Sequence, residues 1–129
     1  MKMQRLMLAL SSRSPKARSL LDAAARLAAQ LQADWFVVHV RQYTTLHYRG
    51  PGAEHIMPVE DLAYARKLGA RVIIERGDVI KALVSFGRTM RVDYFVTGRP
   101  LRRRISFSWR LPLTEAIQRK LPNAIVIIV

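Results

Sequence analysis

The sequence predicts a single α/β domain in which a five-stranded parallel sheet carries helices on both faces. Short apolar, β-branched segments alternate along the chain with longer segments whose apolar residues recur every three or four positions. The chain of 129 residues contains neither an internal repeat nor a linker, and its length suits one domain. Strands that alternate with helices favour a parallel sheet with right-handed crossovers.

The composition excludes several other classes of protein. Hydrophobic residues make up 50% of the chain, which argues against intrinsic disorder, and the absence of cysteine excludes a disulfide scaffold. No apolar run approaches the roughly 18 residues that span a bilayer, and the first ten residues lack a secretory pattern. We therefore expect a compact, soluble, cytoplasmic domain.

The first two strands and the helix between them follow from local pattern. Leu6 to Leu10 is an apolar strand that stops at a polar turn, and Pro15 begins an amphipathic helix. Ser14 is the expected N-cap of that helix, and proline suits its first position. The β-branched and aromatic segment Trp35 to Val40 is predicted as a buried strand.

The rest of the chain continues the alternation after an aperiodic segment, Gln42 to Pro58. The expected elements are a helix over Val59 to Leu68, a strand over Arg71 to Glu75, a helix over Val79 to Met90 capped by Asp78, a strand over Asp93 to Thr97, an irregular basic segment over Arg99 to Leu111, a helix from Pro112 to Leu121 and a strand over Ala124 to Val129.

Ligands of such sheets bind beyond the carboxyl ends of the strands, where the strand order reverses. The segments at these ends are Ser11 to Ser14, Arg41 to Tyr43, Arg76 to Asp78 and Gly98 to Arg104. Arginine recurs in them, and the first carries three serines before a helix N-terminus, where free N–H groups and the helix dipole favour an anion. The sequence thus predicts an anion site at this edge of the sheet.

Positive charge is unusually high and unevenly spread. The chain has 22 Lys and Arg against 9 Asp and Glu, a formal net charge of +13. Five arginines lie between Arg99 and Arg110, interleaved with Phe107 and Trp109. Arginine matches phosphate and carboxylate geometry, and aromatic rings among arginines suit base stacking or a partner contact. Because no helix-turn-helix or RNA-binding signature is present, we do not expect nucleic acid as the partner.

Several segments resemble the universal stress protein superfamily, and more specifically the universal stress domain of the KdpD potassium-responsive sensor histidine kinases. These segments are Leu8 to Pro15 (LALSSRSP), Ala23 to Ala29 (AAARLAA), Phe36 to Val40 (FVVHV), Val96 to Arg99 (VTGR) with the following arginines and Trp109, and Ile125 to Val129 (IVIIV). The resemblance covers nearly the whole chain. It implies the strand order 3-2-1-4-5 and a nucleotide cleft between the first and fourth strands.

The ATP motif of the superfamily is interrupted in this chain. ATP-binding members carry an Asp after the first strand and a Gly-x2-Gly-x9-Gly-(Ser/Thr) motif after the fourth. Ser11 occupies the acidic position, and after Gly98 the later motif positions hold Leu101, Leu111 and Pro112. Glycine serves such a loop because a residue without Cβ lets backbone N–H groups wrap a phosphate.

A cyclic di-AMP pattern of one KdpD branch is matched in part. That pattern is Ser-x-Ser, twenty residues, then Phe-Thr-Ala-x-Tyr. Ser12 and Ser14 match it, and Trp35 stands at the spacing of the aromatic residue. Phe36 and His39 replace the Thr and the Tyr.

The resemblance and the strand ends together predict a noncatalytic regulatory domain that binds an anionic ligand, with cyclic di-AMP and ATP as candidates. The serines and nearby N–H groups would receive a phosphate, the arginines would supply countercharge, and an aromatic ring would flank a base. The expected site residues are Ser11, Ser12, Arg13, Ser14, Trp35, His39, Arg41, Gly98, Arg99, Arg102, Arg103 and Arg104.

An interaction module without a small-molecule ligand is the alternative. Its arginine loop would contact an acidic partner domain or anionic lipid headgroups. We expect no metal site, because His39, His47 and His55 stand eight residues apart without cysteine or nearby carboxylate support. We also expect no enzyme, since neither a Gly-x-Ser-x-Gly elbow nor a Walker pattern occurs.

The last strand and the resemblance each predict a binding partner. Ala124 to Val129 is apolar throughout and would lie at a sheet edge, so we expect a homodimer through this strand. In a sensor kinase the domain would contact other domains of the same receptor and belong to its cytoplasmic part. The phosphoryl chemistry would then lie elsewhere in the protein.

Overall fold

The predicted strands pair in parallel in one sheet. The computed structural model describes residues 3–11, 16–41, 57–98 and 113–129. The strands are β1 (Gln4–Ala9), β2 (Ala33–Arg41), β3 (Arg71–Arg76), β4 (Tyr94–Thr97) and β5 (Ile125–Ile128). Their order is β3-β2-β1-β4-β5, which confirms the order that the resemblance implied.

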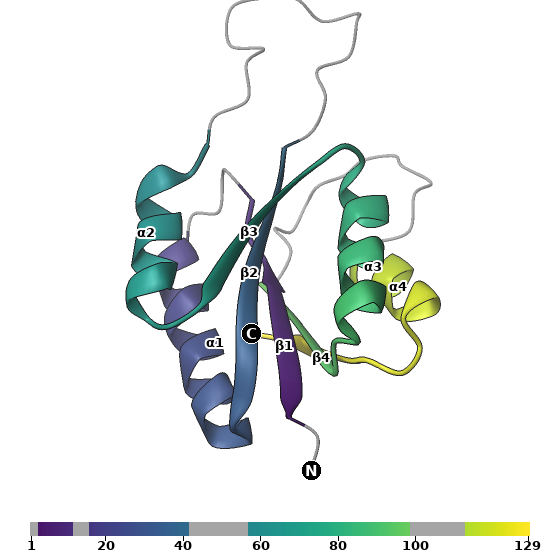
Figure 1. Cartoon of the computed structure of the whole chain (residues 1–129), viewed down its shortest axis with the longest axis horizontal. Helices are drawn as coiled ribbons and strands as arrows, with labels where there is room; N and C mark the ends of the chain where they lie inside the picture. The colour runs from purple at the N-terminus through teal and green to yellow at the C-terminus, as the bar shows by residue number, and fades with distance from the viewer. Residues whose placement is uncertain (1–2, 12–15, 42–56, 99–112) are drawn as a thin grey trace, which may run out of the picture.

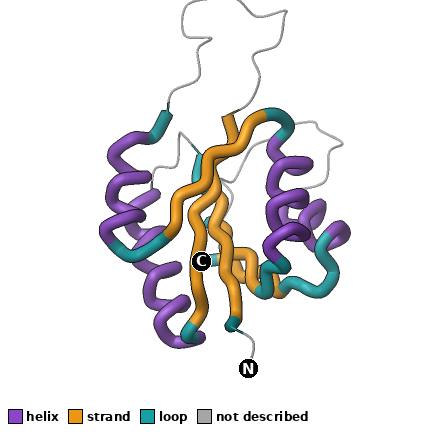
Figure 2. Tube along the Cα trace, viewed as in Figure 1, coloured by secondary structure: helices purple, strands orange, loops and turns teal. Residues whose placement is uncertain are grey.

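Helices cover both faces of the sheet, so that the molecule has three layers (Figures 1 and 2). The helices α1 (Ala17–Leu31) and α2 (Val59–Lys67) pack on one face, and α3 (Val79–Met90) and α4 (Leu113–Lys120) on the other. Alternate side chains of β2 serve the two cores, since Trp35 and Val37 pack with α1 whereas Phe36 and Val38 pack with α3. No helix in the described part of the chain is long and apolar enough to cross a membrane.

The predicted N-cap of α1, Ser14, is wrong. The helix begins at Ala17, and Lys16 takes the N-cap position with φ −119° and ψ 39°. Ala17 is buried and Lys16 is exposed, so the helix starts where its apolar face first meets the sheet. Ser14 and Pro15 lie outside the described residues. The other boundaries agree within the one or two residues over which element ends fray.

The amino-terminal end of β1 is held by Arg5 and Asp93. The N–H of Arg5 donates to Asp93 Oδ2 at 2.9 Å, and the N–H of Asp93 donates back to the Arg5 carbonyl at 2.8 Å. The Asp93 carbonyl accepts from the N–H of Ile125 at 2.9 Å, and Arg5 Nη1 donates to the carbonyl of Met90 at 2.7 Å. These bonds tie β1 to the end of α3 and to the starts of β4 and β5.

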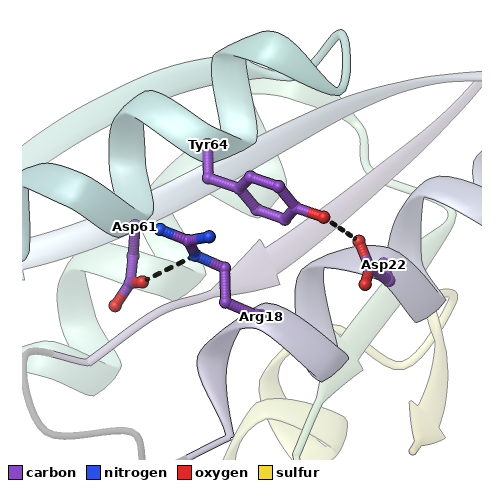
Figure 3. Close-up of polar contacts among 4 residues, drawn as sticks. All are labelled: Arg18, Asp22, Asp61 and Tyr64. Atoms are coloured by element: carbon purple, nitrogen blue, oxygen red, sulfur yellow. Dashed lines mark hydrogen bonds and ion pairs between the residues drawn. The ribbon is translucent and has the colours of Figure 1, made fainter.

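A polar cluster joins α1 to α2 (Figure 3). The Tyr64 hydroxyl donates to Asp22 Oδ1 at 2.5 Å, and Arg18 Nε lies 3.5 Å from Asp61 Oδ1. The Arg18 guanidinium also stacks over the Tyr64 ring, 4.3 Å from its centroid. The hydrogen bond to Asp22 raises the pKa of Tyr64 above its ordinary value, and burial and the negative charge of Asp22 add to this effect.

The raised pKa of Tyr64 predicts a loss of stability at alkaline pH. Folding favours the neutral phenol, so this stabilisation is complete below the ordinary pKa of 10.0 and is lost as pH rises through the folded-state value. We expect the free energy of unfolding of the wild type to fall more steeply above that pH than that of Tyr64→Phe. Urea titrations at a series of alkaline pH values, with tyrosinate absorbance recorded in parallel, measure the difference.

The matched control is Tyr94→Phe. The Tyr94 hydroxyl donates to the uncharged side chain of Gln4 at 3.3 Å, so this substitution removes a tyrosine hydroxyl without removing a hydrogen bond to a carboxylate. This variant should keep the wild-type pH slope. Equal slopes for the wild type and Tyr64→Phe would contradict the prediction.

Candidate functional site

The carboxyl edge between β1 and β4 is the point at which the strand order reverses. β1 pairs in parallel with β2 on one side and with β4 on the other. The helix that follows β1 covers one face of the sheet, and the helix that precedes β4 covers the opposite face. The two crossovers therefore diverge at this edge, which is where open α/β sheets bind their ligands.

The structure brings four predicted site residues to this edge. Ser11 follows β1 and is exposed, and Gly98 follows β4 and is half-buried. His39 and Arg41 lie at the carboxyl end of the strand β2, and Arg41 is half-buried. The predicted residues Ser12, Arg13, Ser14, Arg99, Arg102, Arg103 and Arg104 lie outside the described residues.

Trp35 lies away from this edge, so its predicted place beside a base does not fit the structure. It pairs in register with Leu6, four residues before His39, which separates it from His39 by about 13 Å along the strand. Its side chain is 7% exposed and belongs to the core beneath α1. The spacing from the serines placed an aromatic residue on β2 but did not indicate that its ring fills the core.

His39 stands at the edge but is enclosed. It is 1% exposed, and its Nδ1 lies 2.8 Å from the carbonyl oxygen of Leu10. Since a carbonyl only accepts, Nδ1 carries the proton in this contact. The N–H of Leu10 donates to the Val38 carbonyl at 3.0 Å. His39 therefore positions the chain just before Ser11 and does not offer an open ring face to a base.

The two helices that begin at this edge differ at their N-termini. Asp78 caps α3 as predicted, because its Oδ2 accepts from the N–H of Lys81 at 3.0 Å. Gly77, with φ 112°, permits the tight turn between β3 and Asp78. Its N–H donates to the Arg41 carbonyl at 2.9 Å. In α1 the N-cap residue Lys16 makes no side-chain cap, and the first turn holds no acidic residue. The positive end of the α1 dipole is therefore not neutralised by its own first turn.

The cations near this edge have different roles. Arg18, in the first turn of α1, is engaged with Asp61 and Tyr64 on α2. Arg41 and Arg76 are partners in register at the ends of β2 and β3, and Arg76 is exposed. Arg76 is absent from the predicted site residues, although its place at a strand end could have indicated it. Among the described residues, no group of three or more His, Cys, Asp or Glu is arranged to hold a metal ion.

Several solved structures with this architecture are universal stress proteins. One, in complex with cAMP, has a TM-score of 0.70 at 18% identity, over 98% of this chain and 96% of that chain. A universal stress protein from Archaeoglobus fulgidus has a TM-score of 0.64 at 22% identity, over 97% and 92% of the two chains. A structure of the universal stress protein from the same organism in complex with dAMP has a TM-score of 0.56 at 21% identity, over 99% and 98%.

The chain has the universal stress protein fold. No protein-family profile matches the sequence, and none of the curated proteins matches it. The universal stress protein fold is therefore established by the sheet order and by these superpositions.

Removing the His39 contact should destabilise the fold at this edge. His39→Phe keeps an aromatic ring but deprives the buried Leu10 carbonyl of its donor, and we expect a loss of about 1–3 kcal/mol in the free energy of unfolding. Thr97→Val is the matched control, since Thr97 is also buried at 8% and, within the described residues, its Oγ1 makes one long contact, 3.5 Å to the Gly98 carbonyl. Urea denaturation followed by circular dichroism compares the two, and similar losses would count against a positioning role for His39.

Proposed function

We propose that this chain is a noncatalytic regulatory domain of the universal stress protein superfamily that binds a nucleotide at the carboxyl ends of β1 and β4. One observation carries the proposal: at the point where the strand order reverses stands a glycine that neither its φ nor its described neighbours require. The complexes of two proteins of this fold with cAMP and dAMP support a nucleotide as the ligand class.

Gly98 is that glycine. The glycines with positive φ within the described residues are Gly69 and Gly77, and Gly98 is not among them. A Cβ at Gly98 would meet Leu20 at 3.6 Å, which is ordinary van der Waals contact. Neither backbone conformation nor packing against the described residues explains glycine here. Close approach of a ligand to the backbone does explain it.

The neighbouring groups complete a site for a phosphate. Ser11 offers an exposed hydroxyl between β1 and the positive end of α1, and Arg41 offers countercharge from the end of β2. Arg13, Arg99 and the arginines at 102 to 104 add countercharge in the proposal, although they lie outside the described residues.

Cyclic di-AMP and ATP remain the candidate ligands, beside the mononucleotides of the solved complexes. The partial cyclic di-AMP pattern also supports kinship with the KdpD sensor kinases. In such a receptor this domain would lie on the cytoplasmic side and pass the state of its ligand site to other domains, while kinase chemistry takes place elsewhere in the protein.

Binding is tested by thermal shift and calorimetry with cAMP, dAMP, ATP, cyclic di-AMP and inorganic phosphate, each at low and moderate salt. A nucleotide at about 100 times its Kd should stabilise the fold by about 2.7 kcal/mol. Gly98→Ala should leave the unliganded melting temperature nearly unchanged and lower affinity about tenfold or more, because its methyl group occupies space that the ligand needs.

Arg41→Gln should weaken binding several-fold, and Arg26→Gln, which removes an exposed arginine from α1, should not. Small, equal shifts with every polyanion that vanish with salt would overturn the nucleotide proposal. They would favour the interaction module whose arginine loop meets an acidic partner or lipid headgroups.

We also propose that β5 forms a homodimer interface. Within the described residues β5 pairs with β4 alone, and Ile125 and Ile128 are 56% and 49% exposed. An apolar edge strand without charge or proline is a pairing surface.

Light scattering on a sizing column at micromolar concentration should give a dimer for the wild type and a monomer for Ile128→Lys. Ile74→Lys is the matched control, because Ile74 is 45% exposed on β3 at the opposite edge. That variant should stay dimeric. A monomeric wild type, or the same mass for both variants, would overturn the β5 interface.

A further inference from the structure

The helices α3 and α4 lie on the face of the sheet opposite α1 and α2 (Figure 1). A groove runs along α3 and reaches the end of α4 at Lys120. Its volume is about 360 Å³, and its lining residues are Ile80, Lys81, Val84, Ser85, Arg88, Thr89 and Lys120. Of the proposed nucleotide site, the residues that the structure describes, Ser11, Arg41 and Gly98, do not line it. The groove is therefore a separate surface of the molecule.

Packing in the core sets the shape of this groove. A Cβ at Gly87 would lie 2.6 Å from Leu121 Cδ1, so α3 and the end of α4 approach each other closely because residue 87 is glycine. The approach brings Lys120 beside α3, where Arg88 Nη2 donates to the Lys120 carbonyl at 3.4 Å. The spacing of the two walls thus follows from a buried contact.

The groove combines a cationic rim with an apolar floor. Lys81, Arg88 and Lys120 are exposed, and no acidic residue is among the described residues that line it. Ile80 is half-buried and Val84 is 5% exposed, so aliphatic side chains form its base. Lys81 and Arg88 stand seven residues apart on α3 and so lie on the same face of the helix.

This chemistry suits an acidic protein segment better than a small anion or a nucleic acid. A small phosphate ligand needs converging donors, but the Lys81 N–H donates to Asp78, the N–H groups from Ala82 onward are used within α3, and exposed cations alone act through a screened field. Nucleic acid would use aromatic rings for stacking, and the described lining contains none. A second copy docked groove to groove would set its own Lys81, Arg88 and Lys120 against the same three cations, so like charges oppose that contact.

We infer that the groove between α3 and α4 is a docking surface for an acidic segment of another protein that also carries aliphatic side chains. Carboxylates of the segment meet the three cations, and its aliphatic side chains cover Ile80 and Val84. A polar, charged rim around an apolar centre is common in protein interfaces. A helix or strand that lies in a groove is a recurrent mode of peptide recognition.

The probe is a fluorescein-labelled peptide as long as α3, which has 12 residues, built from alternating pairs of Glu and Leu. Fluorescence anisotropy measures its affinity for the full chain. Lys81→Glu, Arg88→Glu and Lys120→Glu in combination should weaken binding about tenfold or more. The combination Arg26→Glu, Arg66→Glu and Lys67→Glu changes net charge equally on exposed positions of α1 and α2, and should change affinity less than about twofold.

Two altered peptides separate the contributions of rim and floor. A peptide with Gln for Glu should lose binding because the cations lose their partners, and one with Ser for Leu should bind several-fold more weakly because the floor stays uncovered. In an NMR titration the largest amide shifts should fall on residues 80–89 and 120. Nucleotide binding should be unchanged in the groove variant, so failure of one proposal is distinguishable from failure of the other.

Three results would overturn the inference. Equal weakening by both triple variants would show that the peptide responds to net charge alone. Equal affinity for the Leu and Ser peptides would show that the aliphatic floor takes no part. A DNA duplex that binds more tightly than the peptide and depends on the same three cations would make the groove a nucleic-acid surface.

Discussion

The fixed position of β1 is the constraint on which the rest of the structure depends. It is the central strand, it pairs on both sides, and Leu6 to Leu8 are fully buried. Arg5 and Asp93 hold its amino-terminal end, and the ring of His39 holds the residue that follows its carboxyl end. Because both ends are tied, Ser11 leaves the sheet at a defined point beside β4. The candidate ligand edge is a consequence of that anchoring.

The large positive charge is divided between structural and accessible cations. Arg5 caps the end of α3, Arg18 joins α1 to α2, and Arg71 lies over the Phe36 ring, 5.7 Å from its centroid. Other cations remain exposed, with Lys81 and Arg88 along α3. Some of the cations behind the net charge of +13 therefore contact other elements of the fold, and others extend into solvent from a helix surface.

Position along a strand explains which site residues could be predicted from the sequence. Three predicted site residues lie at the expected edge because each ends a strand or follows one within two residues: Ser11, Arg41 and Gly98. The carboxyl ends of parallel strands lie on one side of a sheet. Trp35 does not lie at that edge, because a spacing taken along the chain contains no information on which ring fills the core. The α1 start was misplaced because Ser14 and Pro15 have suitable cap chemistry, whereas contact of Ala17 with the sheet determined where the helix begins.

The sequence by itself determined the alternation of strands and helices, the cap of α3 at Asp78 and the apolar faces that each element buries. Those features depend on local propensity and on periods of two and 3.6 residues, which any stretch of chain carries within itself. Tertiary structure alone decided that His39 supports β1, and that Gly87 admits Leu121 and so creates a groove between α3 and α4. Those features depend on contacts within a few ångströms between side chains that are far apart in the sequence. A local sequence pattern carries no information about which distant residues come into contact.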